Sequence, residues 1–193
     1  EPDNSLRDTT FKVDLDEISK CTQEILSGDS EVVLDELIKL NGSSNGARPK
    51  INVGVSKDKK KITSFAEASK TDEFWLIKFA NSNDVKDVAN VEYAYSLMAK
   101  AAGIDMPKTH LFISKKGKAF FGIERFDVNY GKRLHMHSLS GLINSDFRIP
   151  SLDYTDLLKA TLNLTRDVRE VEKIFKLAVF NVLAHNQDDH AKN

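Results

Sequence analysis

Phe74-Trp75-Leu76-Ile77-Lys78-Phe79 is a run of six residues in which one lysine interrupts five apolar side chains. A short apolar run of this kind is typical of a strand buried inside a sheet. Taking an ammonium group out of water is costly, so Lys78 is expected to face a carboxylate or a phosphate. Glu92, near the start of the next predicted helix, is the candidate carboxylate. The alternative is that Lys78 lies at the strand end and extends its ammonium group to water.

The patterns on both sides of this run predict an α+β fold, with strands in the middle of the chain and helices after residue 150. Strands are predicted at 50–56 and 61–65, and a hairpin at 109–113 and 119–124. Helices are predicted at 14–26, 30–41, 84–102, 151–163 and 168–184, with Asp14, Ser30, Asp84 and Asp167 as N-caps, Glu170 at a capping-box position, and Val88, Val91, Tyr95, Met98 and Ala102 as the apolar stripe of the third helix.

Composition narrows the class of protein. The 193 residues allow one domain, or two lobes of one domain. The 28 Lys and Arg residues balance 29 Asp and Glu residues, so no basic footprint indicates direct nucleic-acid binding. A single cysteine, Cys21, excludes an internal disulfide and fits a reducing compartment. No apolar run approaches the roughly 18–20 residues of a transmembrane helix, and no secretory signal is present.

The last nine residues are His185-Asn186-Gln187-Asp188-Asp189-His190-Ala191-Lys192-Asn193. Asp188 and Asn193 have the spacing of the protein-kinase catalytic loop, in which the aspartate accepts the proton of the substrate hydroxyl and the asparagine holds magnesium. Two alternatives remain. His185, Asp188, Asp189 and His190 also suit a zinc, iron or manganese site of a metal-dependent hydrolase. The segment can also be a solvated polar helix end.

Two further segments have residues suited to nucleotide binding. The small residues of 42–47, followed by Lys50, allow backbone N–H groups to approach an anion, although the segment is not a Walker A motif and can be an ordinary connector. Glu124-Arg125-Phe126-Asp127 follows a predicted strand and can present backbone groups to an adenine edge. The structural alternative for this second segment is a strand end with paired charges.

In their order along residues 40–193, these segments together resemble the HipA family of bacterial serine/threonine kinase toxins. The matching pieces are Gly46-Ala47-Arg48-Pro49-Lys50, Trp75-Leu76-Ile77-Lys78-Phe79, Asn90-Val91-Glu92-Tyr93, Ala101-Ala102-Gly103-Ile104 with Pro107, Glu124-Arg125-Phe126-Asp127, Leu134-His135 and Asn186–Asn193. The Glu-Arg-Phe-Asp segment and the terminal motif are the most specific of them.

The resemblance implies a two-lobed, protein-kinase-like fold that binds ATP and Mg²⁺. Residues 1–126 would be the sheet-containing N-lobe, with a phosphate loop at 42–50, and residues 127–193 the start of a helical C-lobe. Asp188 would be the catalytic residue and Asn193 a magnesium ligand. The implied nucleotide-binding residues are Asn45, Gly46, Ala47, Arg48, Pro49, Lys50, Lys78, Glu124, Arg125, Phe126, His190, Ala191, Lys192 and Asn193.

The resemblance also implies a biological role. Family members phosphorylate a serine or threonine of a protein, with aminoacyl-tRNA synthetases as known targets, and thereby arrest translation and promote persistence. They act in the bacterial cytoplasm and are held by a HipB-like helix-turn-helix antitoxin, through which most DNA contact is made. Ser43 matches the autophosphorylated serine of the family, with Ser44 as an adjacent alternative. A phosphate there would add nearly two negative charges beside the ATP phosphates.

Three departures from the family pattern set further expectations. The N-terminal subdomain of the family is largely absent from these residues, either as in the shorter split members of the family or because it lies outside this sequence. Asn186-Gln187 replaces the His-Arg of ordinary kinases. The second magnesium-binding aspartate would lie beyond Asn193, so we expect an incomplete C-lobe and little kinase activity from this chain alone. A non-catalytic module that binds an antitoxin is therefore a third hypothesis, beside the kinase and the hydrolase.

Overall fold

The computed structural model describes residues 13–26, 49–81, 84–129, 132–146, 148 and 152–192. The chain divides into two compact units, which are described separately. Unit 1 consists of Glu1–Ser96 with Pro107–Arg133, and unit 2 of Leu97–Met106 with Leu134–Asn193. The helix predicted at 30–41 lies outside the described residues. Among the helices that the structure describes, none is long and apolar enough to cross a membrane.

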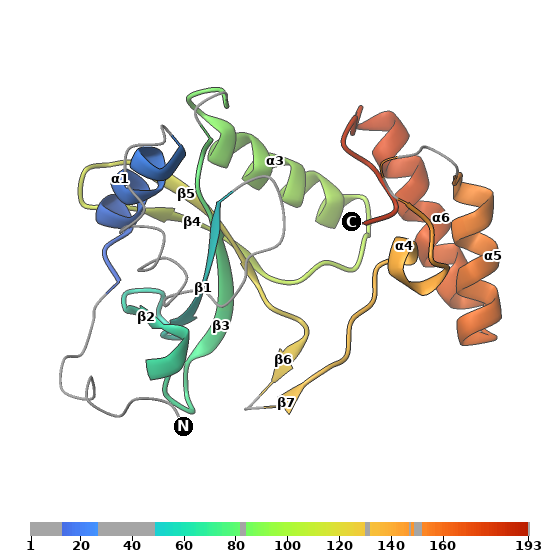
Figure 1. Cartoon of the computed structure of the whole chain (residues 1–193), viewed down its shortest axis with the longest axis horizontal. Helices are drawn as coiled ribbons and strands as arrows, with labels where there is room; N and C mark the ends of the chain where they lie inside the picture. Colours follow the sequence, from blue (N-terminus) through green and yellow to red (C-terminus); the bar gives the residue numbers. More distant parts are fainter. Residues whose placement is uncertain are drawn as a thin grey trace. The chain divides into compact units, whose positions relative to one another are not determined.

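Unit 1 is built on a five-stranded sheet (Figure 1). The strand order is β2-β1-β3-β5-β4, and every neighbouring pair is antiparallel. The predicted strands and hairpin are confirmed. The elements of this unit are α1 (Leu15–Leu26), β1 (Lys50–Val55), β2 (Ile62–Ser64), the short 3-10 helix η1 (Phe65–Glu67), β3 (Glu73–Lys78), the first part of α3 (Val88–Ala101), β4 (Thr109–Ile113), β5 (Ala119–Glu124), and the small ribbon of β6 (Val128–Asn129) and β7 (Lys132–Arg133).

The core of unit 1 lies between α1 and one face of the sheet. Asp14 caps α1 as predicted, because its Oδ1 accepts the backbone N–H of Asp16 at 3.0 Å. The cluster of buried apolar residues comprises Leu15, Ile18, Ile51, Val53, Val55, Trp75, Ile77, Phe79, Phe112 and Phe120. Alternation along the strands places Trp75 and Ile77 on this core face and Lys78 on the opposite face.

Helix α3 begins later than predicted and buries a different face. Asp84 does not cap it, because its Oδ2 accepts the N–H of Asn81 at 2.8 Å and the helix begins four residues further on. The predicted stripe of Val91, Tyr95 and Met98 is exposed, whereas Ser96 and Ala99 are buried. This helix is apolar on most of its circumference, so residue spacing alone could not identify the buried face.

Gly103 ends α3 as predicted. Its φ is +73°, and the N–H groups of Gly103 and Ile104 donate to the carbonyls of Lys100 and Ala99. These two hydrogen bonds form a Schellman motif, which favours glycine at the left-handed position.

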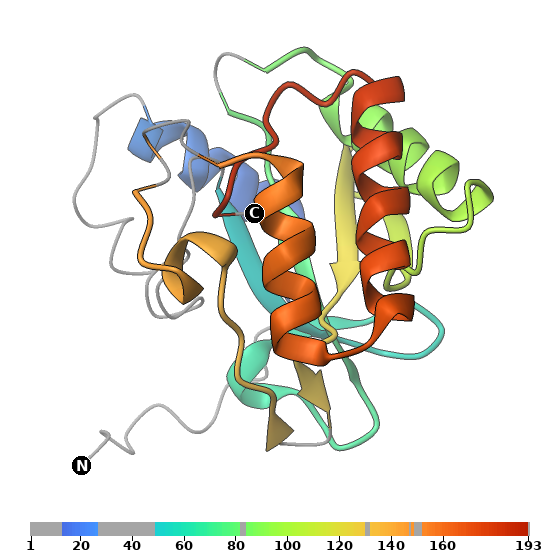
Figure 2. The ribbon, with the colours of Figure 1, turned by 90° about the vertical axis from the view of Figure 1, so that its right-hand side faces the viewer.

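Unit 2 contains α4 (Leu139–Leu142), α5 (Tyr154–Thr165) and α6 (Val168–Leu183), with α5 and α6 side by side (Figure 2). Asp167 caps α6 as predicted, accepting the N–H of Arg169. The predicted capping box at Glu170 is wrong, because the Glu170 carboxylate pairs with Lys173 at 2.8 Å. A capping box is instead found at the start of α5, between Asp153 and Asp156.

Candidate functional site

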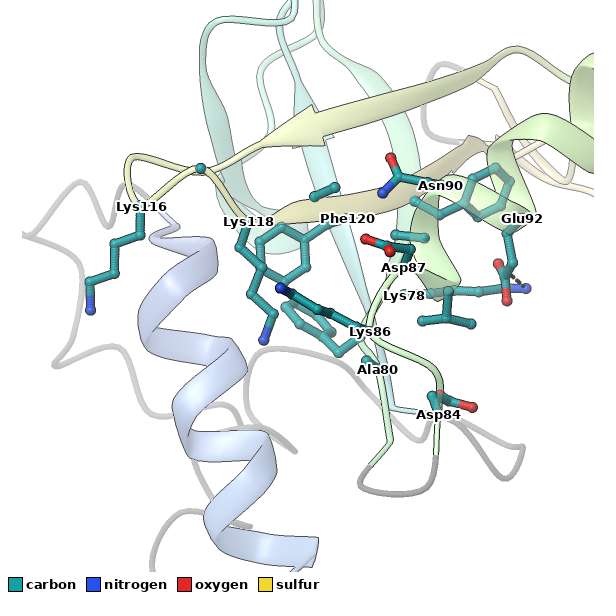
Figure 3. Close-up of a pocket in the computed structure, with 16 residues that line it drawn as sticks. Lys78, Ala80, Asp84, Lys86, Asp87, Asn90, Glu92, Lys116, Lys118 and Phe120 are labelled. Atoms are coloured by element: carbon teal, nitrogen blue, oxygen red, sulfur yellow. Dashed lines mark ion pairs between the residues drawn. The ribbon is translucent and has the colours of Figure 1, made fainter.

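Lys78, the last residue of β3, pairs with Glu92 in the second turn of α3. Lys78 Nζ lies 3.0 Å from Glu92 Oε2, and the two side chains are 35% and 19% exposed (Figure 3). Lys78 Nζ also lies 5.5 Å from the centre of the Phe121 ring, on the sheet face opposite the core. The carboxylate partner predicted for Lys78 is therefore confirmed. The pair orients the ammonium group while leaving a third of the lysine side chain accessible to a ligand.

Lys50 lies directly opposite Lys78 in the register of β1 and β3. Opposed residues of antiparallel strands project from the same face, and like charges in that arrangement destabilise a sheet. The β1 strand is held at this end by Phe79, whose N–H donates to the Pro49 carbonyl at 2.9 Å. This end of the two strands therefore favours a nearby anion. The remainder of the predicted phosphate loop, including Ser43, Ser44, Asn45, Gly46, Ala47 and Arg48, lies outside the described residues.

A pocket of about 340 Å³ adjoins the Lys78–Glu92 pair. Its wall includes the start of α3 and the beginning of β5, where Phe120 and Phe121 are buried. Lys86 and Lys118 also line it, and neither was predicted as a site residue (Figure 3). The charged turn at 114–118 was recognisable in the sequence. Its place beside the pocket depends on the pairing of β5 with β3, which the sequence does not show.

The segment after β5 is held by the side chain of Arg125. Arg125 Nη1 donates to Asn52 Oδ1 on β1 at 2.8 Å, and Nε donates to Asp127 Oδ1 at 3.0 Å. This guanidinium lowers the pKa of Asp127 through its hydrogen bonds. Arg125 thus fixes the segment to the sheet, and its guanidinium is occupied by protein groups.

The side chains of Glu124 and Phe126 differ in their access to a ligand. Glu124 is opposite Trp75 in the register, so its side chain belongs to the core face, away from Lys78. Its carboxylate lies 3.5 Å from Lys108 Nζ. The Phe126 side chain is 65% exposed. A contact from Glu124 to a ligand on the Lys78 face would therefore have to come from the backbone.

In unit 2, the two adjacent aspartates of the loop after α6 have different surroundings. The chain leaves the helix through His185, whose φ is +55°. The Asp188 side chain is 94% exposed and lies 3.9 Å from His190 Nε2. Asp189 Oδ2 accepts hydrogen bonds from Tyr154 Oη and, at 3.0 Å, from Asn181 Nδ2. The loop thus presents Asp188 to solvent while Asp189 is bound to both neighbouring helices.

Further contacts shape the same loop. The Ala191 carbonyl accepts the N–H of Ser140 at 2.8 Å, and His190 Nδ1 accepts the N–H of Lys192 at 3.3 Å. Burial, followed by the hydrogen bond to Asp189, raises the pKa of the Tyr154 phenol, so this group remains a donor at neutral pH. Asn193, the predicted magnesium ligand, lies outside the described residues.

The ligand set of the hydrolase alternative does not assemble. Within the described part of the chain, no three His, Cys, Asp or Glu side chains are placed to hold a metal ion together. This includes His185, Asp188, Asp189 and His190. The carboxylate of Asp188 remains a suitable oxygen donor for magnesium.

Taken together, the fold and the site define a mixed α+β protein with an antiparallel sheet, a strand lysine paired with a helix glutamate, and an exposed aspartate after a long helix. A family model for the HipA-like C-terminal domain matches residues 42–193, which is well over half of the chain. The chain therefore belongs to the HipA-like C-terminal domain family.

The chain is also similar to a solved structure of HipA from the toxin–antitoxin system of Shewanella oneidensis MR-1, in complex with HipB and its operator DNA. The identity is 20% and the TM-score 0.60, and the match covers 78% of this chain and 39% of that chain. The fold is thus that of HipA, and this chain spans about two fifths of the length of that protein. A search of curated protein sequences found no match.

Proposed function

We propose that this chain contributes the phosphate-binding lysine and the catalytic aspartate of an ATP- and Mg²⁺-dependent serine/threonine protein kinase. The observation that carries the proposal is the 3.0 Å ion pair between Lys78 on β3 and Glu92 on α3. In protein kinases, a strand lysine paired with a glutamate of the following helix binds the ATP phosphates. The strand order and the position of α3 between β3 and β4 support this assignment of Lys78 and Glu92.

Each residue has a distinct role in this proposal. Lys78, held in place by Glu92, neutralises phosphate charge, with Lys50 opposite it in the sheet. Asp188 orients the substrate hydroxyl and accepts its proton. Magnesium, when bound, neutralises the charge that develops on the phosphate oxygens, and Asn193 is the residue proposed to hold it. Backbone groups of Glu124 and Phe126 contact the adenine, while Arg125 fixes their segment to β1.

We further propose that the kinase acts as the toxin of a HipBA-like system in the bacterial cytoplasm. Its partner would be a HipB-like helix-turn-helix antitoxin, which provides most of the DNA contact, and its substrate a protein such as an aminoacyl-tRNA synthetase. Autophosphorylation at Ser43, or at Ser44, would regulate it. Family membership and the fold of the HipA in the HipA–HipB–DNA complex support this part of the proposal.

The test uses a full-length version of the protein and measures ATP affinity and the transfer of labelled γ-phosphate to protein. Lys78→Ala should weaken ATP binding by about tenfold to a hundredfold, the range expected from the loss of a charge-assisted hydrogen bond. Asp188→Asn should leave ATP affinity within about twofold and abolish transfer. Lys70→Ala, at an exposed position of unit 1, is the matched control and should change neither quantity.

The two site variants also define the result that would contradict the proposal. If Lys78→Ala and Asp188→Asn both leave phosphoryl transfer intact, the proposed kinase function is wrong. Glu92→Gln adds an intermediate case, because it retains the shape of the side chain but removes the charge that orients Lys78. Its effect on ATP affinity should be smaller than that of Lys78→Ala.

A further inference from the structure

Asp188 and Asp189 carry the same functional group and are adjacent in the sequence, but their surroundings differ. The Asp188 side chain is 94% exposed. Asp189 instead contacts two different helices, because Tyr154 is the first residue of α5 and Asn181 belongs to the last turn of α6. Both donors converge on the same oxygen, Asp189 Oδ2. A carboxylate that accepts two donors from separate helices fixes the middle of the loop to both.

The hydrogen bonds continue from Asp189 to the backbone of Asp188. Asn181 donates to Asp189 through Nδ2 and accepts from Asn186 Nδ2 through Oδ1, at 3.0 Å and 3.3 Å. Asn186 Oδ1 in turn accepts the N–H of Asp188 at 3.2 Å. The amide of Asp188 is therefore connected to α5 and α6 through a continuous series of side-chain hydrogen bonds.

We propose that Asp189 and Tyr154 are positioning residues, which hold the loop so that Asp188 projects toward the substrate. The role of Asp188 rests on the proposed kinase function, but the positioning of the loop by Asp189 does not. Both acids suit proton transfer or metal binding by type, and in the sequence only the spacing to Asn193 separates Asp188 from Asp189. The two donors on Asp189 Oδ2 distinguish them here, because a carboxylate already engaged by a phenol and an amide is suited to anchoring.

The experiment compares Tyr154→Phe, Asp189→Ala, Asp189→Asn and Asp188→Asn by amide hydrogen exchange at Asp188, followed by NMR. Tyr154→Phe and Asp189→Ala should accelerate this exchange by about fivefold, the factor that corresponds to a net ~1 kcal/mol hydrogen bond. Asp189→Asn should remain within about twofold of wild type, since its Oδ1 can accept both donors. Asp188→Asn should also leave the exchange unchanged, as should the control Tyr93→Phe, which removes a phenol from α3.

Kinetics of phosphoryl transfer by a full-length version of the protein supply the second measurement. Tyr154→Phe and Asp189→Ala should lower kcat by about fivefold with an unchanged KM for ATP, and Asp189→Asn should restore the rate. Unchanged exchange at Asp188 in both Tyr154→Phe and Asp189→Ala would overturn the inference. So would an Asp189→Asn protein that loses transfer as completely as Asp188→Asn while keeping a protected loop. If a full-length version of the wild-type protein transfers no phosphate, the kinase proposal fails, and the exchange measurement still decides the positioning role.

Discussion

At the scale of single residues, charged side chains of unit 1 are placed by specific partners. Lys78 was predicted to have an anionic partner because it interrupts an apolar strand, and Glu92 is that partner. A second cluster was not predicted: Glu73 pairs with Lys59 and, at 2.9 Å, with Lys108, beside the buried Trp75. Lys59 and Lys108 come from different turns and loops, so only the strand order brings them to one carboxylate. Local sequence pattern cannot supply that information.

The Glu73 cluster should make the stability of the protein depend on pH. Burial raises the pKa of Glu73, but hydrogen bonds from Lys59 and Lys108 outweigh this effect and lower the pKa from 4.5 to about 2. A carboxyl group whose pKa is lower in the folded state stabilises the protein above its unfolded pKa, and this stability is lost as the pH falls through the folded value. The free energy of unfolding should therefore decrease between about pH 4.5 and pH 2.

Replacing Glu73 tests this assignment. Allowing for solvent screening, the ion pairs of Glu73 should contribute about 1–2 kcal/mol at neutral pH. Glu73→Gln should remove that contribution and flatten the pH dependence, as measured by urea unfolding at several pH values. Glu67→Gln, at an exposed position of η1, is the control and should keep the wild-type slope. An identical pH dependence in wild type and Glu73→Gln would rule out Glu73 as the source.

At the scale of secondary-structure elements, strands were predicted better than the helix that lies beside the site. The hairpin of β4 and β5 has the predicted bounds, because its two apolar runs flank a polar turn that contains Gly117 at a φ of +77°. Helix α3 has apolar residues on most sides, so its buried face, with Ser96 bonded to Thr109 at 2.9 Å, was missed. The predicted start of α3 was also wrong, because the Asp84 carboxylate accepts the N–H of Asn81 in the preceding loop and does not cap the helix.

A close contact inside the sheet gives a prediction at this scale. A Cβ atom on Gly122 of β5 would overlap the ring of Phe112 on β4, which packs edge-on against Trp75 at 5.7 Å. Gly122→Ala should therefore destabilise the protein by about 1–3 kcal/mol, the usual effect of overpacking. The measurement is the free energy of unfolding by urea.

The partner of Gly122 provides the control. Phe112→Leu removes the ring that the new methyl group would meet, at its own cost in packing. The double variant should then be at least about 1 kcal/mol more stable than the sum of the two single effects predicts. Strict additivity would show that the Phe112 ring does not cause the effect of Gly122→Ala.

A helix cap gives a second prediction for elements. Asp153 and Asp156 form reciprocal hydrogen bonds at the start of α5, each accepting the backbone N–H of the other. Asp153→Ala should destabilise unit 2 by about 1 kcal/mol, whereas Asp153→Ser, which retains a capping oxygen, should lose less. Thermal unfolding followed by circular dichroism measures both. Equal losses in the two variants would mean that the cap does not stabilise this helix.

At the scale of the whole molecule, burial is distributed unequally between the two units. Among its described residues, unit 1 has a cluster of ten buried apolar side chains. Among the described residues, α5 has no buried residue and α6 has one, Ala178. The sequence predicted sheet and helices in the correct order, but the helical patterns gave no indication that so little of α5 and α6 is covered. Pattern identifies an apolar helix face, whereas its burial depends on which other elements pack against it.

This inequality predicts different local stabilities. Amide hydrogen exchange should be at least about tenfold slower in β1, β3 and β5 than in α5 and α6, because opening the helices exposes less buried surface. Native-state exchange followed by NMR or mass spectrometry measures this directly. Comparable protection in the sheet and in the two helices would contradict the prediction.

Trp75 is the only tryptophan in the 193 residues, and its side chain is fully buried in the sheet of unit 1. Its indole emission is therefore a built-in optical reporter of one unit, whereas far-ultraviolet circular dichroism records the helices of both. If the units unfold together, the two signals will share one midpoint. If they unfold separately, much of the helical signal will be lost in a first transition. The indole emission will then shift to longer wavelength in a second transition at higher temperature.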